Sequence, residues 1–445
     1  MNIPNKATAI HLFDFHSVPM RAFHLSWLAF FLCFFGWFGL APLMPVIRDE
    51  LHLTKEQIAN SGIAAVTITV LIRVLIGWLC DRIGPRRAFT GLLVIGSLPV
   101  MGVGLSHNFT SFLIFRLAIG AIGASFVITQ FHTSIMFAPN IVGTANATAA
   151  GWGNLGGGVT QMVMPLLFSA FLSTGFSVWW SWRLAMLAAG FALLLTGVAY
   201  YFLTEDTPEG DYLKLRAAGA IGKKNCGSFA EAIHDPRVWA LALLYASSFG
   251  IELTIDNFAA LYYTDYFHLS LRMAGVVASS FGMMNLFARA LGGMLSDRAN
   301  RRWGLQGRVR LLGCAILGEG LAMMLFSQMS MLPLAIGSMM FTGLFVKISN
   351  GANYSIVPFV NKRVLGFVAG IVGAGGNAGA VLAGFLFKTP RLTYPQAFFI
   401  LGILIATLSL VAVAVRFSQQ EESSARQEIE ARLRARLAPA TATGA

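Results

Sequence analysis

The chain has 445 residues, of which 56% are hydrophobic and only 12% are charged, and its formal net charge at pH 7 is +12. A soluble globular chain carries about 25% charged residues, so this composition excludes a soluble protein and indicates a polytopic membrane protein. The basic residues lie mainly in short segments between apolar runs, where they set membrane topology, and we expect no nucleic-acid partner.

Twelve apolar runs are long enough to cross a bilayer as helices. They lie at 23–47, 58–80, 88–106, 110–137, 142–172, 180–203, 237–264, 272–295, 309–328, 331–357, 364–387 and 395–416. The runs fall into two sets of six, so we predict an all-α membrane protein with two pseudo-symmetric six-helix bundles, at 23–203 and 237–416. A cytoplasmic N-terminal segment (1–22), a cytoplasmic linker (204–236) and a charged cytoplasmic tail (417–445) complete the chain.

Basic residues are concentrated in the N-terminal segment, the even-numbered loops and the tail, and they are sparse in the odd-numbered loops. Because cytoplasmic loops carry the excess of lysine and arginine, we expect a multi-pass protein of the cytoplasmic membrane with both termini in the cytoplasm. The four cysteines show no CxxC spacing and the eight histidines are scattered. The sequence therefore predicts no metal site, no cofactor and no disulfide framework.

The second and eighth spans carry an internal repeat. The second span ends in Arg73-Val-Leu-Ile-Gly77-Trp-Leu-Cys-Asp81-Arg82, and the pattern returns as Arg289-Ala-Leu-Gly-Gly293-Met-Leu-Ser-Asp297-Arg298, 216 residues later (289 − 73 = 216). If each Asp-Arg pair marks the water boundary, eight residues at about 1.5 Å each put both leading arginines roughly 12 Å inside the membrane. A charge there costs about 2.5 to 3.5 kcal/mol on insertion scales, and an anion is the simplest reason to keep two of them.

The loop after the second span contains Gly77-x-x-x-Asp81-Arg82-x-Gly84-x-Arg86-Arg87. This stretch resembles the cytoplasmic loop motif of the major facilitator superfamily. The glycine permits close helix approach, and the Asp and Arg side chains can form ion pairs that latch one state of a gate. The second copy keeps Asp297 and Arg298, but the residues after them differ from the motif, so the pattern predicts ion pairs of a gate less clearly there.

The fifth and eleventh spans each contain a glycine-rich stretch with one asparagine. These stretches are Gly151-Trp-Gly153-Asn154-Leu-Gly156-Gly157-Gly158 and Gly370-Ile-Val-Gly373-Ala-Gly375-Gly376-Asn377. Glycine costs about 1 kcal/mol relative to alanine inside a helix, so such runs indicate a packing seam or a hinge of a gate. The seam leaves the asparagines unexplained, and their amide donors could meet an oxyanion.

The paired glycine-asparagine stretches resemble the signature motifs of the nitrate/nitrite porter family, a branch of the same superfamily. The two span arginines fit the family too, as do Met284-Asn285-Leu-Phe-Ala-Arg289 and Gly250-Ile-Glu252-Leu-Thr-Ile-Asp256-Asn257. The resemblance covers both halves. It implies that Arg73 and Arg289 clamp the oxygens of nitrate or nitrite, that Asn154 hydrogen-bonds the anion, with Asn377 its counterpart, and that Phe126, Tyr245 and Phe249 enclose its plane.

The chemistry of these anions agrees with such a site. Nitrate and nitrite are planar monoanions, so a selective site should offer donors in one plane and apolar faces above and below it. Arginine supplies a planar fork of donors and stays charged, unlike lysine or histidine. Two arginines around one monoanion leave a surplus positive charge that disfavours an empty closed cavity, so closure should depend on substrate.

Buried ionisable residues in the second half are candidates for proton coupling. Tyr245, Phe249, Glu252 and Asp256 fall within roughly 60° of one another on one helix face, at about 100° per residue. Carboxylates inside a membrane are often proton relays. Lys347 in the tenth span and Glu319 in the ninth are further candidates, and they could instead pair with each other.

From these features we expect a monomeric secondary transporter that carries nitrate, and nitrite too, by alternating access, with protons as co-substrate. Exchange of nitrate for nitrite without protons is the alternative within the same class. An anion channel or a nitrate-sensing receptor on the same scaffold is the alternative from another class. The sequence offers no nucleophile-base pair, and we do not expect an enzyme.

Overall fold

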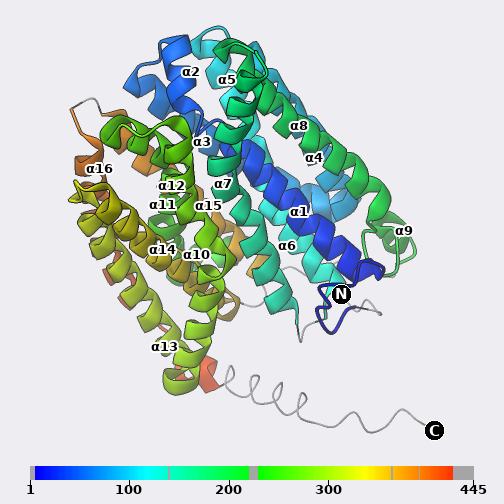
Figure 1. Cartoon of the computed structure of the whole chain (residues 1–445). Helices are drawn as coiled ribbons and strands as arrows, with labels where there is room; N and C mark the ends of the chain where they lie inside the picture. The colour runs from blue at the N-terminus through cyan, green and yellow to red at the C-terminus, as the bar shows by residue number, and fades with distance from the viewer. Residues whose placement is uncertain (1–5, 139–140, 220–228, 362–363, 390, 424–445) are drawn as a thin grey trace.

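The computed structural model describes residues 6–138, 141–219, 229–361, 364–389 and 391–423. These ranges are predominantly helical, and their helices form two bundles that lie side by side (Figure 1). Most of the predicted tail lies outside the described residues, as does the side chain of Asp81, one of the predicted gate residues.

The first bundle holds the crossings of the N-terminal half. Its helices are α1 (Val18–Phe38), α3 (Lys55–Ile83), α4 (Pro85–Gly102), α5 (Phe109–Ile119), α6 (Ser125–Met136), α7 (Val142–Ser173) and α8 (Val178–Leu203). The 3-10 segment η2 (Gly120–Ala124) joins α5 to α6, so these two make one crossing. The run predicted at 23–47 is not one helix: α1 ends at Phe38, and the short helix α2 (Met44–Leu51) begins after Pro42, which has no N–H to donate.

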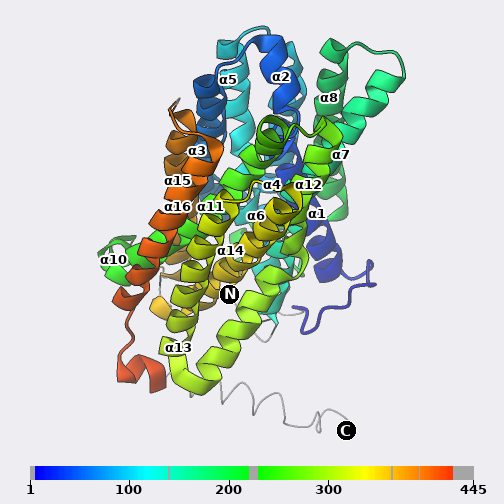
Figure 2. The ribbon, with the colours of Figure 1, turned by 60° about the vertical axis from the view of Figure 1, so that its left-hand side comes forward.

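The second bundle holds the remaining crossings. Its helices are α11 (Pro236–Phe267), α12 (Leu271–Met283), α13 (Ala288–Ser327), α14 (Leu332–Val360), α15 (Leu365–Lys388) and α16 (Tyr394–Leu408), with the 3-10 segments η3 (Met284–Leu286) and η4 (Ser409–Ala414). α13 contains a break at Trp303 and Gly304, where Gly304 has φ +67°, and the chain folds back there (Figure 2). Across this turn the Arg308 guanidinium lies 2.8 Å from the carboxylate of Asp297.

Within the described residues, eleven helical segments are long and apolar enough to cross a membrane. One of them, Leu271–Ser327, makes two crossings because of the break in α13. The predicted twelve-helix, all-α membrane architecture is therefore confirmed.

The two bundles are held together at the end of the molecule where α2 lies. The Arg48 guanidinium of α2 contacts both carboxylate oxygens of Asp265, at 2.7 and 2.8 Å, and Lys388 lies 3.1 Å from Glu56. Lys55 donates to the backbone carbonyls of Thr389 and Leu392 across the same junction. The first and last described residues lie at the opposite end (Figure 1).

Glycines show where the bundles approach each other and where they do not. A Cβ added to Gly282 of α12 would lie 2.1 Å from the Cα of Gly158 in α7, so only glycine permits this backbone contact. Near the α2 end, a Cβ on Gly384 would lie 2.6 Å from Ile63 of α3. Toward the opposite end Gly370 has no neighbour within 4 Å, and Gly77 has only one, at 3.9 Å. The bundles are thus in close contact near the α2 end, whereas these two glycines make no contact with the other bundle.

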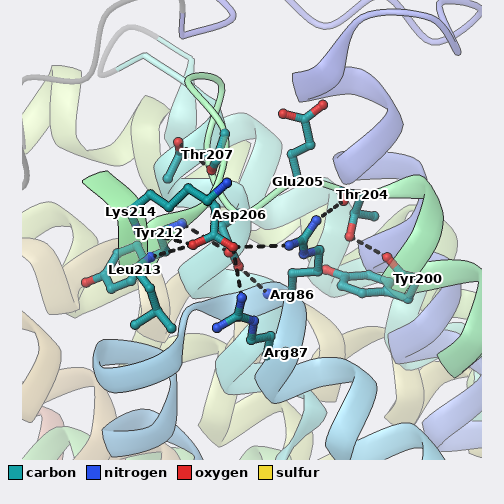
Figure 3. Close-up of polar contacts among 12 residues, drawn as sticks. Arg86, Arg87, Tyr200, Thr204, Glu205, Asp206, Thr207, Tyr212, Leu213 and Lys214 are labelled. Carbon is teal, nitrogen blue, oxygen red and sulfur yellow. Dashed lines mark hydrogen bonds and ion pairs between the residues drawn. The ribbon is translucent and has the colours of Figure 1, made fainter. Parts of the chain in front are cut away.

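The segment after α8 is bound to the first bundle. It contains α9 (Tyr212–Ala217), and the rest of the predicted linker contains α10 (Phe229–His234). Asp206 is fully buried and accepts hydrogen bonds from the backbone N–H groups of Arg86, at 2.9 Å, and Tyr212, at 3.1 Å. Figure 3 shows Arg86 and Arg87 pointing from the start of α4 toward this segment, where each guanidinium pairs with Asp211, at 3.3 and 3.0 Å.

Candidate functional site

A small cavity with a volume of about 10 Å³ lies between the two bundles. Both bundles contribute to its wall. The lining residues are Phe34, Arg73, Phe126, Asn154, Tyr245, Phe249, Arg289 and Tyr354. Six of the seven residues predicted to bind substrate are therefore brought together in one place.

Arg73 of α3 reaches the cavity from the first bundle. Its NH1 group donates to the carbonyl of Gly373 in α15, at 3.0 Å, so the side chain crosses to the other bundle. Its guanidinium lies 5.8 Å from the centre of the Phe126 ring. Its Nε is buried without a hydrogen-bond partner, and no carboxylate in the described part of the chain forms an ion pair with it. This arginine has donor capacity left for an anion.

Arg289 of α13 reaches the same cavity from the second bundle. Its NH2 group donates to the hydroxyl of Tyr245, at 3.4 Å, and lies 3.8 Å from a carboxylate oxygen of Glu252. Its guanidinium lies 5.7 Å from the centre of the Phe249 ring. This distance is near the upper limit for an ion pair. Glu252 therefore offsets the charge of Arg289, but the two side chains do not form a close, two-pronged salt bridge.

Aromatic rings form the apolar walls of the cavity. Tyr245 and Phe249 are stacked, with centroids 5.1 Å apart and planes 7° from parallel. Tyr354 lies edge-on to Tyr245, at 4.9 Å, and to Phe126, at 6.1 Å. Flat faces and charged forks together suit a small planar anion.

The two predicted asparagines differ in position. Asn154 lines the cavity: its amide nitrogen donates to the carbonyl of Ala150, at 2.9 Å, while its carbonyl oxygen is buried without a partner. Asn377 is fully buried with both amide atoms unbonded, but it is not among the cavity-lining residues in this structure. Its role in binding stays a prediction.

Sequence reasoning missed two lining residues. Tyr354 lies seven residues after Lys347, or two turns along the same helix, and that spacing could have placed both on one inward face. Phe34 carried no signal because it is one of 36 phenylalanines, several of them in the first span.

A buried ion-pair network lies directly behind Arg289. Glu252 is 1% exposed, and its Oε1 lies 2.7 Å from the ammonium of Lys347, which is fully buried. Asn285 donates to Oε1 of Glu252 at 2.8 Å, and Asn350 donates to Oε2 at 2.7 Å. In this structure Lys347 therefore pairs with Glu252, and not with Glu319 as the sequence also allowed.

The other two predicted proton-coupling carboxylates lie near this network. Asp256 is 3% exposed and sits one turn beyond Glu252 on α11, toward the α2 end. Its carboxylate lies 3.0 Å from where a Cβ on Gly157 would be, so it faces α7 of the other bundle. Glu319 of α13 is fully buried, and neither of its carboxylate oxygens has a hydrogen-bond partner among the described residues.

Three of the predicted gate glycines, Gly156, Gly375 and Gly376, lie at close packing contacts in this structure. A Cβ on Gly156 would meet the Phe31 carbonyl of α1 at 2.0 Å, and one on Gly375 would meet the Ala242 carbonyl of α11 at 2.5 Å. A Cβ on Gly376 would lie 2.7 Å from Phe249 and 2.9 Å from Tyr245. The glycine-rich stretch of α15 thus lets the cavity aromatics sit against its backbone.

The four predicted charged gate residues whose side chains the structure describes do not pair across the bundles. Arg82 stacks over Trp78, at 4.6 Å, and Arg86 binds the segment after α8. Asp297 pairs with Arg308 within α13, and Arg298 is exposed. Asp206 and Asp211, the acidic partners of the α4 arginines, were not anticipated because they lie in a stretch that reads only as a polar linker.

The chain resembles known transporters in both sequence and fold. The model of the Major Facilitator Superfamily matches residues 26–306, and that of MFS/sugar transport proteins matches residues 246–440. The chain is 40% identical over 417 residues to the high affinity nitrate transporter 2.5 of Arabidopsis thaliana, covering 93% of this chain and 83% of that protein. It is 29% identical to the nitrate/nitrite transporter NrtP of Nostoc punctiforme, covering 88% and 91% of the two chains.

Among solved structures, the chain resembles a D-xylose-proton symporter with a TM-score of 0.70 at 16% identity, covering 89% of this chain and 97% of that one. A bacterial homolog of the human lysosomal transporter Spinster gives a TM-score of 0.66 at 17% identity, covering 96% and 100%. At this identity the likeness establishes the shared fold.

Proposed function

Because the chain belongs to the nitrate/nitrite porter family of the major facilitator superfamily, we propose that it carries nitrate, and also nitrite, across the cytoplasmic membrane by alternating access. The family consists of transporters, so the chain is not an enzyme. The observation that carries the proposal is the meeting of Arg73 and Arg289, one from each bundle, in a single aromatic-walled cavity.

The free donors of Arg73 and the position of Asn154 support an anion held across the bundle interface. The unpaired Nε of Arg73 and the guanidinium of Arg289 would contact oxygens of the anion from opposite sides. Tyr245, Phe249 and Phe126 would cover its faces. An anion bridging both arginines lowers their mutual repulsion, so it favours the state in which the bundles close around it.

The distribution of basic residues supports a cytoplasmic location for both termini. The α2 end, opposite the described ends of the chain, would then face outward. Contacts such as Arg48 with Asp265 close that end, so in this orientation the structure would correspond to a state sealed to the outside. Transport would proceed by breaking these contacts while the opposite end closes.

The geometry around Glu252 supports coupling to protons. Glu252 is shared by Lys347, at 2.7 Å, and Arg289, at 3.8 Å. Nitrate at Arg289 would compete with Glu252 for that cation, and a carboxylate that loses a positive neighbour binds a proton more readily. Anion and proton would then load together. In this proposal Asp256, one turn away on α11, would pass protons to Glu252, and Lys347, the ion-pair partner of Glu252, and Glu319 would take part in the same relay.

Uptake into proteoliposomes tests both the substrate and the coupling. Under symport, an imposed inward proton gradient should drive nitrate accumulation in vesicles that contain no nitrite. Nitrate entry only when nitrite is trapped inside would instead establish exchange. A flux that neither saturates nor responds to counter-anion would identify a channel, and binding without flux would identify a receptor.

A further inference from the structure

Glu252 is held by two side-chain amides that differ in where they are anchored. Asn350, on α14, donates to Oε2, and its own carbonyl oxygen accepts from the hydroxyl of Ser248 at 2.8 Å. Both of these partners belong to the same bundle as Glu252. Asn285 donates to Oε1, and its carbonyl oxygen is buried without a partner. Asn285 is therefore fixed only through the bond that it makes to Glu252.

Asn285 also lies where its helix is irregular. It sits in the 3-10 segment η3 between α12 and α13, and the next residue but one, Phe287, has non-helical angles of φ −131° and ψ −34°. A 3-10 stretch inside a long helix often marks a hinge. Arg289 follows four residues after Asn285. The irregular backbone at Phe287 therefore lies between Asn285, which donates to Glu252, and Arg289, which lines the cavity.

The same break rests against the other bundle. A Cβ on Gly151 of α7 would lie 3.2 Å from the backbone carbonyl of Asn285. One turn earlier, Gly282 meets Gly158 backbone to backbone. Relative movement of the bundles must change these contacts, and η3 is the segment that would respond.

We propose that Asn285 is a positioning residue that makes the proton affinity of Glu252 depend on which way the transporter faces. The proposal rests on the proton symport proposed above. In the state described here Asn285 donates to Glu252, which favours the ionised carboxylate and releases the proton to the inside. When the α2 end opens and α7 leaves η3, the donation weakens and Glu252 accepts a proton from the outside.

The charged groups around Glu252 do not provide this dependence by themselves. Lys347, Arg289, Asp256 and Glu319 interact with it electrostatically, but all of them belong to its own bundle and move with it. The titratable hydroxyl of Tyr245 also belongs to that bundle. From the first bundle, α7 presents the uncharged Gly157 near Asp256, and Arg73 lies across the cavity. Arg116 of α5 reaches α11 farther along the helix, at Asn257, to which it donates at 3.0 Å.

The test compares two variants of the full chain in proteoliposomes. Asn285→Leu removes the donor on the break, and Asn350→Leu removes the donor that stays within the bundle. Nitrate transport is measured while external pH and internal pH are varied separately. Asn285→Leu should raise the internal-pH midpoint by about one unit, a tenfold change in proton affinity, and leave the external midpoint unchanged. Asn350→Leu should shift both midpoints.

Equal shifts of both midpoints in Asn285→Leu, or a shift of neither, would overturn the positioning role. If Asn285→Leu does not fold, Asn285→Ala removes the same donor without crowding the break, and nitrate binding within threefold of wild type verifies its integrity. Wild-type transport that ignores both pH values would refute the symport itself. If wild-type transport depends on pH but Asn285→Leu and Asn350→Leu shift the two midpoints in the same way, the role of Asn285 alone would be refuted.

Discussion

Replacing Arg73 by lysine separates the geometry of this arginine from its charge. In the structure NH1 is committed to the carbonyl of Gly373, at 3.0 Å, and the buried Nε is free. An anion can therefore receive two hydrogen bonds from the Nε edge of the guanidinium, whereas a lysine ammonium offers a point charge on a flexible stem. Losing one hydrogen bond between charged partners costs about 1.5 to 3 kcal/mol.

At 1.4 kcal/mol per tenfold, Arg73→Lys should raise the dissociation constant for nitrate by roughly 10- to 100-fold. Titration calorimetry on purified protein measures this directly, and uptake in proteoliposomes should fall in parallel. Arg116→Lys is the matched control, because Arg116 is a buried arginine of the same bundle that hydrogen-bonds Asn257 at 3.0 Å and does not line the cavity. If Arg73→Lys binds nitrate as tightly as wild type, the anion does not depend on two hydrogen bonds from the Arg73 guanidinium.

Three further outcomes are expected. Glu252→Gln should abolish proton-driven accumulation but retain nitrate/nitrite exchange, and accumulation at the wild-type level would exclude this carboxylate from coupling. Burial opposes ionisation of Asp211, but hydrogen bonds from the N–H groups of Lys214 and Leu213 and the charges of Arg87 and Arg86 lower its pKa below the usual 3.8. Its stabilisation is thus present above pH 3.8 and is lost as pH falls through the lowered pKa. Asp211→Asn should therefore reduce the thermal midpoint most at pH 7 and progressively less as pH falls below 3.8; an equal loss at every pH would contradict this. Gly376→Ala should weaken nitrate binding because its methyl would meet Phe249 at 2.7 Å, whereas Gly370→Ala, with no neighbour within 4 Å, should bind as wild type; equal affinities would show that the aromatic wall tolerates displacement.

The architecture was readable from the chain because membrane insertion is governed by local hydropathy. Each crossing is an apolar run of its own, and the repeated arginines sit at a fixed distance from the Asp-Arg pair that follows them. One error in the helix bounds, the run at 23–47, came from counting apolar residues without giving enough weight to Pro42.

Sequence singled out Arg73 and Arg289, since a charge buried in lipid needs a reason and an anion is the simplest one. That both arginines hold one anion came from the family resemblance. The aromatic residues came from the family resemblance, and it is their stacking around the arginines that the structure adds.

Tertiary structure alone decided which buried charges meet. Glu252, Lys347 and Asn285 lie on three different crossings, and nothing in their spacing predicts that one carboxylate binds the other two side chains. The same holds for the contact of Asp265 with Arg48, more than 200 residues apart, and for the arginines of α4 with the segment after α8. Hydropathy and helical period are properties of neighbouring residues, and they fix what each helix is. The partner of a side chain depends on how helices rotate and pack against one another, and that is set only when the whole chain has folded.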